Sequence, residues 1–325
     1  MTKKITALKL VFIFLLATLL YSCQQTVEWE QLDPISTEEW THYKGKPYTG
    51  VVLVPSRGSS EHPYEYKISY KKGLRHGECI WYFPNGDVYQ IIEYKEGRKH
   101  GNQIVFYHEN HMQKSSKNHF KSGREHGKQI SYYIDGQVRS ISNYIEGERH
   151  GEWIDYYEDG QIKLIRNYTD GNQSGEQIRY YENGQIKLKG NYKISKSLPG
   201  TAKYGNWVEY YENGQIKEKK FHLGNYEFDG PWISYFEDGQ IKEKKNYKDG
   251  DRHGKWIKYY EDGQVKSIGN YKDDKQDGEW LKYYQNGSIE EKLTYKNGNL
   301  DAGIKYRENG TVSHVSEGGS WRFQW

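Results

Sequence analysis

A unit of about 24 residues recurs along most of the chain, and this period limits the possible folds more than any other feature. From Gly77 onward the units open 24 to 30 residues apart, and the longest interval holds the insertion 194–204. Such a period indicates a stacked repeat array rather than a conventional domain. With a degenerate first unit from Gly50, the array has about eleven units. The other opening residues are Gly101, Gly127, Gly151, Gly175, Gly205, Gly230, Gly254, Gly278 and Gly303.

Each unit has the pattern of an antiparallel β-hairpin. In the unit 151–175, residues 152–158 alternate polar and apolar or aromatic side chains, which is typical of a strand. Asp159 and Gly160 favour a tight turn, because Gly accepts a positive φ without steric cost. Residues 161–168 form the returning strand. We therefore predict an all-β fold, an elongated, open, solenoid-like array of antiparallel β-hairpin repeats.

The side chains of one unit cannot form a core alone. Successive strand residues point to opposite faces, so Ile154 and Tyr156 share one face, and Trp153 and Tyr157 share the other. The chain is only 34% hydrophobic yet 16% aromatic, an aromatic content that a disordered chain would lack. We expect the repeats to stack so that each Ile and Tyr lies beside the same residue of the next repeat. These contacts between repeats would stabilise the array in place of a core.

The first 22 residues have the pattern of a secretory signal peptide. Three lysines and no acidic residue precede the apolar run 10–20. As a helix this run covers about 16 Å, too short for a hydrocarbon core of about 30 Å. Residues 20–23, LYSC, resemble a bacterial lipobox, in which Cys23 receives the lipid. The alternative is an ordinary signal peptide followed by an incidental Cys.

Four parts are expected: the signal peptide 1–22, a tether 23–42, the repeats 43–315 and a cap or tail 316–325. Loss of the leader leaves 44 basic and 44 acidic residues, and nothing in that balance implies nucleic-acid binding. Cys79 is then the only other thiol, which we expect to be a small buried strand residue. We predict a lipid-anchored protein of the bacterial cell envelope, at the outer membrane or periplasmic face.

The repeat also resembles a known family. The pattern G-x-W-x-x-Y-Y-x-N-G-Q-I-K, followed by Y-K-x-G, is similar to MORN-repeat proteins, specifically the bacterial MORN-repeat variant, whose members are often labelled antitoxins of the YwqK type. The resemblance covers residues 43–312 and implies an elongated array of antiparallel hairpins. It also implies an association with membrane surfaces and protein scaffolding. Gln103, Gln129 and Gln177 depart from the pattern at the Trp position.

The Trp-bearing side of the hairpins is the best candidate for recognition. Aromatic rows stack on sugar rings or anchor protein partners, and the alternative is that these rings only pack on neighbouring units. The candidate binding residues are Trp153, Trp207, Trp232, Trp256, Trp280, Tyr211, Tyr260 and Tyr284.

Two recurring sets of polar residues are not expected to carry chemistry. Histidines before the opening Gly would lie about 10 Å apart, too far for one metal ion, so we predict turn residues and no metal site. Acids before the hairpin turns share one environment, whereas glycoside hydrolysis needs two different ones. No G-x-S-x-G or H-E-x-x-H motif occurs, and we predict no catalytic residue, no cofactor and no enzyme activity. The histidines are His76, His100, His126, His150 and His253.

These observations favour a non-catalytic, membrane-anchored binding or scaffold protein with a protein or glycan partner. One alternative is an antitoxin or immunity-like protein that neutralises a toxin. Another is a carbohydrate-binding module acting through the Trp residues. The membrane contact would run through the lipid on Cys23, and the oligomeric state stays open.

Overall fold

The computed structural model describes residues 25–34, 36, 40–54, 65–108, 113–194, 200–224 and 227–323. These residues contain β-strands and one short 3-10 helix, η1 (Trp29–Gln31), and no helix among them is long and apolar enough to cross a bilayer. The chain divides into two compact units, an N-terminal unit ending at Glu148 and a C-terminal unit starting at Arg149. The expected signal peptide 1–22 and the expected lipidation site Cys23 lie outside the described residues.

The N-terminal unit is built from sequential antiparallel strands, with β1 added in parallel beside β4. The short strands β2 and β3 form a separate two-stranded sheet. The strands are β1 (Thr26–Glu28), β2 (His42–Tyr43), β3 (Lys46–Pro47), β4 (Gly50–Val54), β5 (Tyr66–Lys71), β6 (Leu74–Tyr82), β7 (Val88–Lys95), β8 (Arg98–Phe106), β9 (Lys114–Lys121), β10 (Arg124–Glu125), β11 (Gly127–Tyr132) and β12 (Val138–Ile145), with β13 (Glu148–Arg149) at the junction.

A small closed core lies at the start of this unit. Val52, Ile68 and Cys79 are at most 1% exposed and pack with Val27 and Leu32. Val27 and Leu32 belong to the segment 23–42, which we expected to be a tether. The structure places this part of the segment in the folded body, because its apolar side chains complete a core that the first strands cannot close alone.

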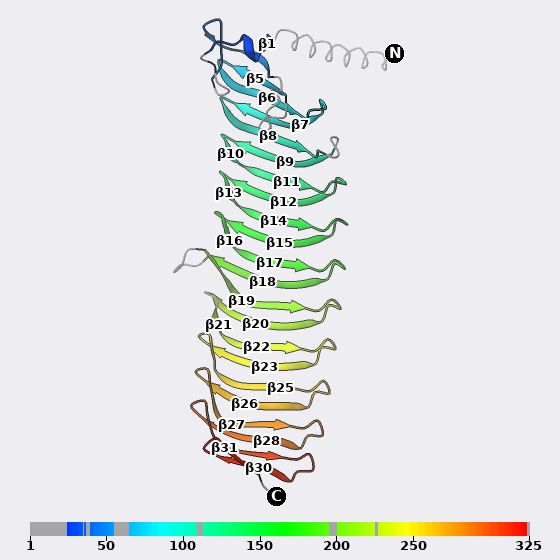
Figure 1. Cartoon of the computed structure of the whole chain (residues 1–325), viewed down its shortest axis with the longest axis vertical. Coiled ribbons are helices and arrows are strands. Elements are labelled where there is room, and N and C mark those ends of the chain that lie inside the picture. The colour runs from blue at the N-terminus through cyan, green and yellow to red at the C-terminus, as the bar shows by residue number, and fades with distance from the viewer. Residues whose placement is uncertain are drawn as a thin grey trace, which may run out of the picture. The chain divides into compact units, whose positions relative to one another are not determined.

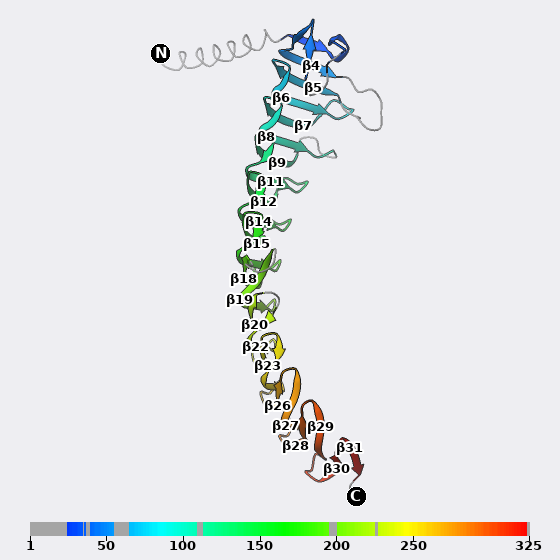
Figure 2. The same ribbon diagram turned by 90° about the vertical axis from the view of Figure 1, so that its left-hand side faces the viewer.

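The C-terminal unit is an open series of hairpins in which strands follow one another in chain order (Figure 1). Figure 2 shows these strands as a single layer. The strands are β14 (Gly151–Tyr156), β15 (Ile162–Thr169), β16 (Asn172–Gln173), β17 (Gly175–Tyr180), β18 (Ile186–Ile194), β19 (Thr201–Tyr210), β20 (Ile216–Gly224), β21 (Glu227–Phe228), β22 (Gly230–Tyr235), β23 (Ile241–Lys248), β24 (Asp251–Arg252), β25 (Gly254–Tyr259), β26 (Val265–Lys272), β27 (Lys275–Tyr283), β28 (Ile289–Lys296), β29 (Asn299–Tyr306), β30 (Val312–Glu317) and β31 (Ser320–Phe323).

Each repeat of about 24 residues contains two kinds of turn. The predicted turn at Asp159 and Gly160 is confirmed: Gly160 has φ 84°, and the Asp159 carboxylate accepts the Gln161 N–H at 2.9 Å. The turn to the next unit has positive φ at both central residues, 48° at Asp170 and 77° at Gly171. Two successive positive φ values define a type I′ turn, whose twist matches that of the flanking strands.

The strand pairing corrects one expectation about stacking. Ile154 of β14 lies opposite Ile165 of β15, and Ile165 lies opposite Ile178 of β17. Equivalent residues of successive units are therefore separated by the returning strand and do not lie side by side. The expectation was wrong because each unit contributes two strands to the sheet, so every column alternates between two positions of the repeat.

The C-terminal segment adds a strand rather than a separate cap. β31 pairs antiparallel with β30, with Val315 opposite Arg322. All its side chains are exposed, including Phe323 at 65%. The part of the expected cap 316–325 that is described thus extends the series of hairpins by one edge strand.

Candidate binding surface

Four of the five predicted Trp residues of the C-terminal unit belong to one continuous aromatic series, which we call the Trp face; the fifth, Trp153, packs on Tyr168 at 5.6 Å outside this series. Tyr side chains from the returning strands alternate with the indoles: the ring centroids are 5.8 Å apart for Trp232 and Tyr247, 5.9 Å for Tyr247 and Trp256, and 5.1 Å for Tyr271 and Trp280. Centroid separations of 4.5–7 Å are those of attractive aromatic pairs. The full series runs through Tyr192, Trp207, His222, Phe228, Trp232, Tyr247, Trp256, Tyr271, Trp280 and Tyr295.

The indole N–H groups of the five predicted Trp residues all donate hydrogen bonds to other groups of the C-terminal unit. These residues are Trp153, Trp207, Trp232, Trp256 and Trp280. Trp207, Trp256 and Trp280 donate to the backbone carbonyls of Asn191, Asn246 and Asn270 at 3.1–3.3 Å. Trp232 donates to the Glu218 carboxylate at 3.0 Å, and Trp153 donates to that of Asp155 at 3.2 Å. Trp207 is 3% exposed and the other four are half-buried.

Cations cover the rings of the Trp face. Lys220 Nζ lies 4.2 Å from the Trp232 ring centroid, and Lys245 Nζ lies 4.9 Å from Trp232 and 5.2 Å from Trp256. Lys203 Nζ is 4.4 Å from the ring of Trp207. These distances fall in the range of cation–π attraction, so lysines already lie over the rings of Trp207, Trp232 and Trp256.

Two glycines take part in this packing. A Cβ on Gly269 would lie 2.1 Å from the Trp280 ring, and one on Gly190 would lie 2.2 Å from the Trp207 ring. Both glycines are buried, and the nearest side-chain atoms belong to the indole of the following hairpin. The absence of a side chain lets the ring lie directly on the backbone of the neighbouring strand.

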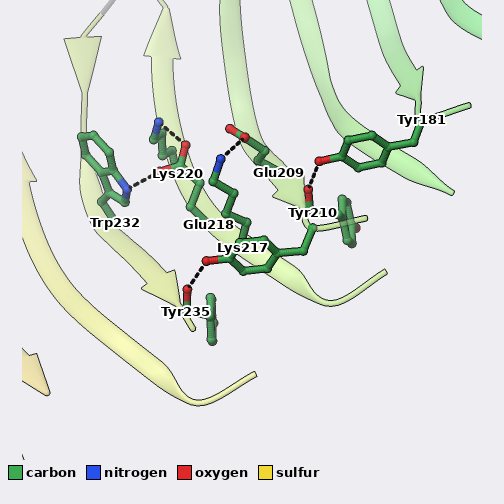
Figure 3. Close-up of polar contacts among 9 residues, drawn as sticks. Tyr181, Glu209, Tyr210, Lys217, Glu218, Lys220, Trp232 and Tyr235 are labelled. Atoms are coloured by element: carbon green, nitrogen blue, oxygen red, sulfur yellow. Dashed lines mark hydrogen bonds and ion pairs between the residues drawn. The ribbon is translucent and has the colours of Figure 1, made fainter. Parts of the chain in front are cut away.

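Ion pairs form on the same face, one between β19 and β20 and one within β20 (Figure 3). Lys217 contacts Glu209 at 2.8 Å, and Lys220 contacts Glu218 beside Trp232. Burial alone would raise the pKa of Glu209, but the hydrogen bond and charge of Lys217 outweigh it and keep that pKa below its usual value.

The charges of one such pair are exchanged further along the array. Lys282 takes the repeat position of Glu209, and Glu290 takes that of Lys217. These two residues form an ion pair at 2.7 Å. Exchange of both charges together preserves the cross-strand attraction, which indicates that the pair matters to the packing of the unit.

In hairpins that end their first strand in a Tyr pair, the second Tyr bonds to the next repeat at several positions. The Tyr181 hydroxyl donates to the Tyr210 carbonyl at 2.8 Å, and the Tyr211 hydroxyl donates to that of Tyr235 at 2.8 Å (Figure 3). The predicted residues Tyr260 and Tyr284 make the same bond to Tyr283 and Tyr306, at 2.7 and 2.9 Å. Burial raises the pKa of Tyr181, so its hydroxyl stays protonated and donates.

Sequence reasoning missed the role of these hydroxyls. The Tyr-Tyr doublet was visible, yet its acceptors are backbone carbonyls, which every residue has. One available signal was the replacement of this Tyr by Phe83 and Phe236, which carry the ring without the hydroxyl.

The Gln residues at Trp positions make hydrogen bonds, to the backbone at Gln129 and to a side chain at Gln177, instead of adding a ring. In the N-terminal unit, Gln129 is 6% exposed. Its side chain accepts the His119 N–H at 3.0 Å and donates to the His119 carbonyl at 2.8 Å. In the C-terminal unit, Gln177 is 6% exposed and accepts from Gln173 at 2.7 Å.

His222 is the most perturbed titratable group near the Trp face. It is 5% exposed and lies between the rings of Trp207 and Phe228, with centroids 6.2 and 4.9 Å away. Burial, with a smaller effect of the Lys203 and Lys220 charges, lowers its pKa to about 4. The imidazole is therefore neutral at pH 7.

Two of the recurring histidines, His150 and His253, lie beside turn acids, and Cys79 lies in the core. His150 and His253 lie 3.6 and 3.4 Å from the turn acids Asp170 and Asp273. Cys79 is fully buried, as predicted, and burial raises its pKa to about 11. Within the described ranges, no cluster of three His, Cys, Asp or Glu residues has the geometry to hold a metal ion.

The family follows from the sequence of the repeats. The family described as MORN repeat variant matches residues 75–96, 125–146, 149–170, 173–193, 203–222, 228–249, 252–273 and 276–297, which together make up more than half of the chain. The chain belongs to the MORN-repeat family, as the pattern predicted. Repeats of this kind suggest a binding or scaffold role.

Solved structures are similar to this chain only distantly. A Photorhabdus luminescens Tc holotoxin pore is 12% identical, with a TM-score of 0.17, over 86% of this chain and 16% of that one. A porin-like protein from Bacteroides uniformis is 7% identical, with a TM-score of 0.17, over 83% of this chain and 91% of that one. The chain thus spans about a sixth of the length of the toxin chain it matches. No functionally curated protein matches the sequence.

Proposed function

We propose that this protein is a non-catalytic binding or scaffold protein of the bacterial cell envelope, held on the membrane by lipid on Cys23. The observation that carries the proposal is the open, repeated sheet of the C-terminal unit, which offers the same side chains at regular intervals over consecutive hairpins. A repeated surface of this kind suits a large partner contacted at many points, as in other repeat arrays.

The Trp face is better suited to holding the sheet together than to stacking sugars. Its indole N–H groups donate within the unit, and lysines lie over the rings of Trp207 and Trp232. A sugar would have to displace these cations before it could reach a ring face. The binding role of the eight predicted aromatic residues therefore stays a proposal, and a protein partner is favoured over a glycan.

The test of this function is affinity capture, in which the full chain is the bait and the proteins of bacterial envelope fractions are the candidates. We expect one or more envelope proteins to be retained, and capture of a single toxin would identify the antitoxin variant of the proposal. A Trp232→Ala, Trp256→Ala chain shows whether the Trp face contributes, and a glycan array tests the carbohydrate alternative. If neither a protein nor a glycan is retained above an unrelated lipoprotein, the binding role is refuted.

The membrane anchor has a separate test. Cys23→Ala is expected to move the protein from the membrane fraction to the soluble fraction, since the lipid chains bury CH₂ groups worth about 0.8 kcal/mol each. Retention of the variant in the membrane fraction would contradict the anchor while leaving the binding function open.

A further inference from the structure

The face opposite the Trp face carries a column of aliphatic residues that lysines interrupt at Lys189, Lys219 and Lys244 in three consecutive hairpins and again at Lys292. Directly paired residues share a face, and Lys219 lies opposite Val208 and Ile233 while Lys220 lies opposite Trp207. Lys219 therefore points away from the Trp face. The column runs through Ile154, Ile165, Ile178, Lys189, Val208, Lys219, Ile233, Lys244, Ile257, Ile268 and Leu281.

Lys189, Lys219 and Lys244 form what we call the lysine row. They stand at the returning-strand position that Ile165 and Ile268 occupy in other hairpins, and they occur in three consecutive hairpins. No ion pair involves them among the described residues, whereas Lys292 at the same position contacts Glu279 at 2.7 Å. Three positive charges thus stand between aliphatic side chains, and within the described residues none of them is held in an ion pair.

A hollow of about 400 Å³ lies beside Lys219. Its apolar lining is Phe221, Pro231 and Ile233, and the rest of the lining is Asn206, Lys219, Lys220, Asp229 and Gly230. Its apolar lining comes from two departures from the repeat. Phe221 replaces the Asn found at 167, 191, 246 and 270, and Pro231 replaces the Glu found at 152, 176 and 279. The Asp229 carboxylate accepts a backbone N–H from Asp249 at 3.4 Å.

We propose that the lysine row binds an acidic amphipathic helix of a partner protein, with one apolar side chain of that helix in the hollow. The proposal rests on the binding function proposed above and gives its partner a chemistry. Charge complementarity calls for acids opposite the three lysines, and the apolar hollow calls for a hydrocarbon side chain between them. A plain polyanion supplies only the first of these features.

The spacing of the row favours a helix. Lys189, Lys219 and Lys244 are two strands apart, so about 10 Å separates neighbours and about 19 Å separates the ends. Helix residues seven apart rise by about 10.5 Å, and residues three or four apart on the same side fall between them. Acids at every seventh position, alternating with apolar residues, would match the alternation of lysine and aliphatic side chains. Lysine side chains are long enough to absorb the remaining difference.

Titration of the full chain with a synthetic helix tests the proposal. The probe is a peptide of about 20 residues with Glu at every seventh position and Leu between. The comparison peptide has the same composition in scrambled order, and polyphosphate serves as a simple polyanion. We expect the registered peptide to bind at least about tenfold more tightly than the scrambled one and to weaken as salt is added.

Variants of the protein locate the binding. Lys189→Gln, Lys219→Gln and Lys244→Gln together are expected to weaken binding about tenfold or more. The matched control carries Lys163→Gln, Lys187→Gln and Lys266→Gln, which remove the same charge from lysines over Tyr rings, and it should bind like the unchanged protein. Phe221→Asn with Pro231→Glu restores the usual residues of the repeat and should weaken the registered peptide alone.

Each other result overturns the proposal. Equal binding of the scrambled peptide or of polyphosphate would mean a plain anion site, and equal loss in the control would mean a general effect of charge. Absence of peptide binding would exclude the helix. If envelope capture still retains a partner and the lysine-row variant retains it equally, this proposal fails while the binding function stands; if capture retains nothing, the function itself fails.

Discussion

The N-terminal unit and the C-terminal unit bury their side chains to different extents. In the N-terminal unit, Val52, Ile68 and Tyr70 are at most 1% exposed and belong to one closed core. The buried apolar side chains among the described residues of the C-terminal unit are Tyr168, Ala202 and Trp207, at 3–7%. The repeats are therefore stabilised mainly by half-buried contacts made many times over, whereas the N-terminal core depends on a few side chains.

The largest expected effect comes from the closed core. Ile68→Ala removes apolar atoms from a site that is 1% exposed, so it should lower the free energy of unfolding of the N-terminal unit by about 2–5 kcal/mol. Hydrogen exchange under mild denaturant reads the protection of each unit separately. Ile165→Ala in a half-buried column is the matched control. A cost as large for Ile165→Ala as for Ile68→Ala would contradict the distinction between the two units.

The sequence predicted the repeated hairpins but not this core. A strict period, the Asp-Gly and Asn-Gly turns and the alternating strands are local signals, and they were enough for the fold class, the turn positions and the family. The core depends on Val27 and Leu32, whose segment shows no periodicity and looked like a tether. Long-range contacts of that kind leave no local pattern in a single sequence.

The candidate surface was predictable only in part. The positions of the Trp residues followed from the repeat, but the cations over their rings depend on strand pairing: Lys220 belongs to the hairpin before that of Trp232. The lysine row could not be predicted from the sequence, because lysines at alternating positions are common on solvated strands. Only the register, which places Lys219 between Val208 and Ile233, distinguishes this row from ordinary surface charge.

The contact of Gly269 with the Trp280 ring tests how far the repeats of the C-terminal unit depend on close packing. Gly269→Ala would place a Cβ 2.1 Å from the Trp280 ring, so the ring must move, at a cost of about 1–3 kcal/mol. Chemical denaturation followed by Trp fluorescence measures the change. In a Trp280→Leu background the same substitution should cost much less. An equal cost in both backgrounds would show that the repeats do not depend on this close contact.

The buried His222 predicts a pH effect confined to the C-terminal unit. Its pKa is about 4 in the folded chain and 6.5 as a free side chain, so the unfolded chain binds more protons between these values. Stability should therefore be complete above about pH 6.5 and fall towards pH 4, by up to about 3 kcal/mol. His222→Tyr restores the residue found at 168, 192, 247, 271 and 295, and should remove this part of the pH dependence. The result is read from unfolding curves at several pH values; an unchanged pH profile in the variant would exclude His222 as its source.

The smallest effect concerns the hydroxyl links between consecutive units. Tyr211→Phe removes the bond to the Tyr235 carbonyl at 2.8 Å and keeps the ring, so it should cost about 0.5–1.5 kcal/mol. Phe236 occupies the same position in the next hairpin without a hydroxyl, so Phe236→Tyr offers the reverse change in an equivalent setting. We expect slower amide exchange around Tyr259 in Phe236→Tyr and faster exchange around Tyr235 in Tyr211→Phe. Changes of opposite sign at these two equivalent positions would show that the hydroxyl bond stabilises the contact between one repeat and the next. Changes of the same sign would contradict that role of the hydroxyl.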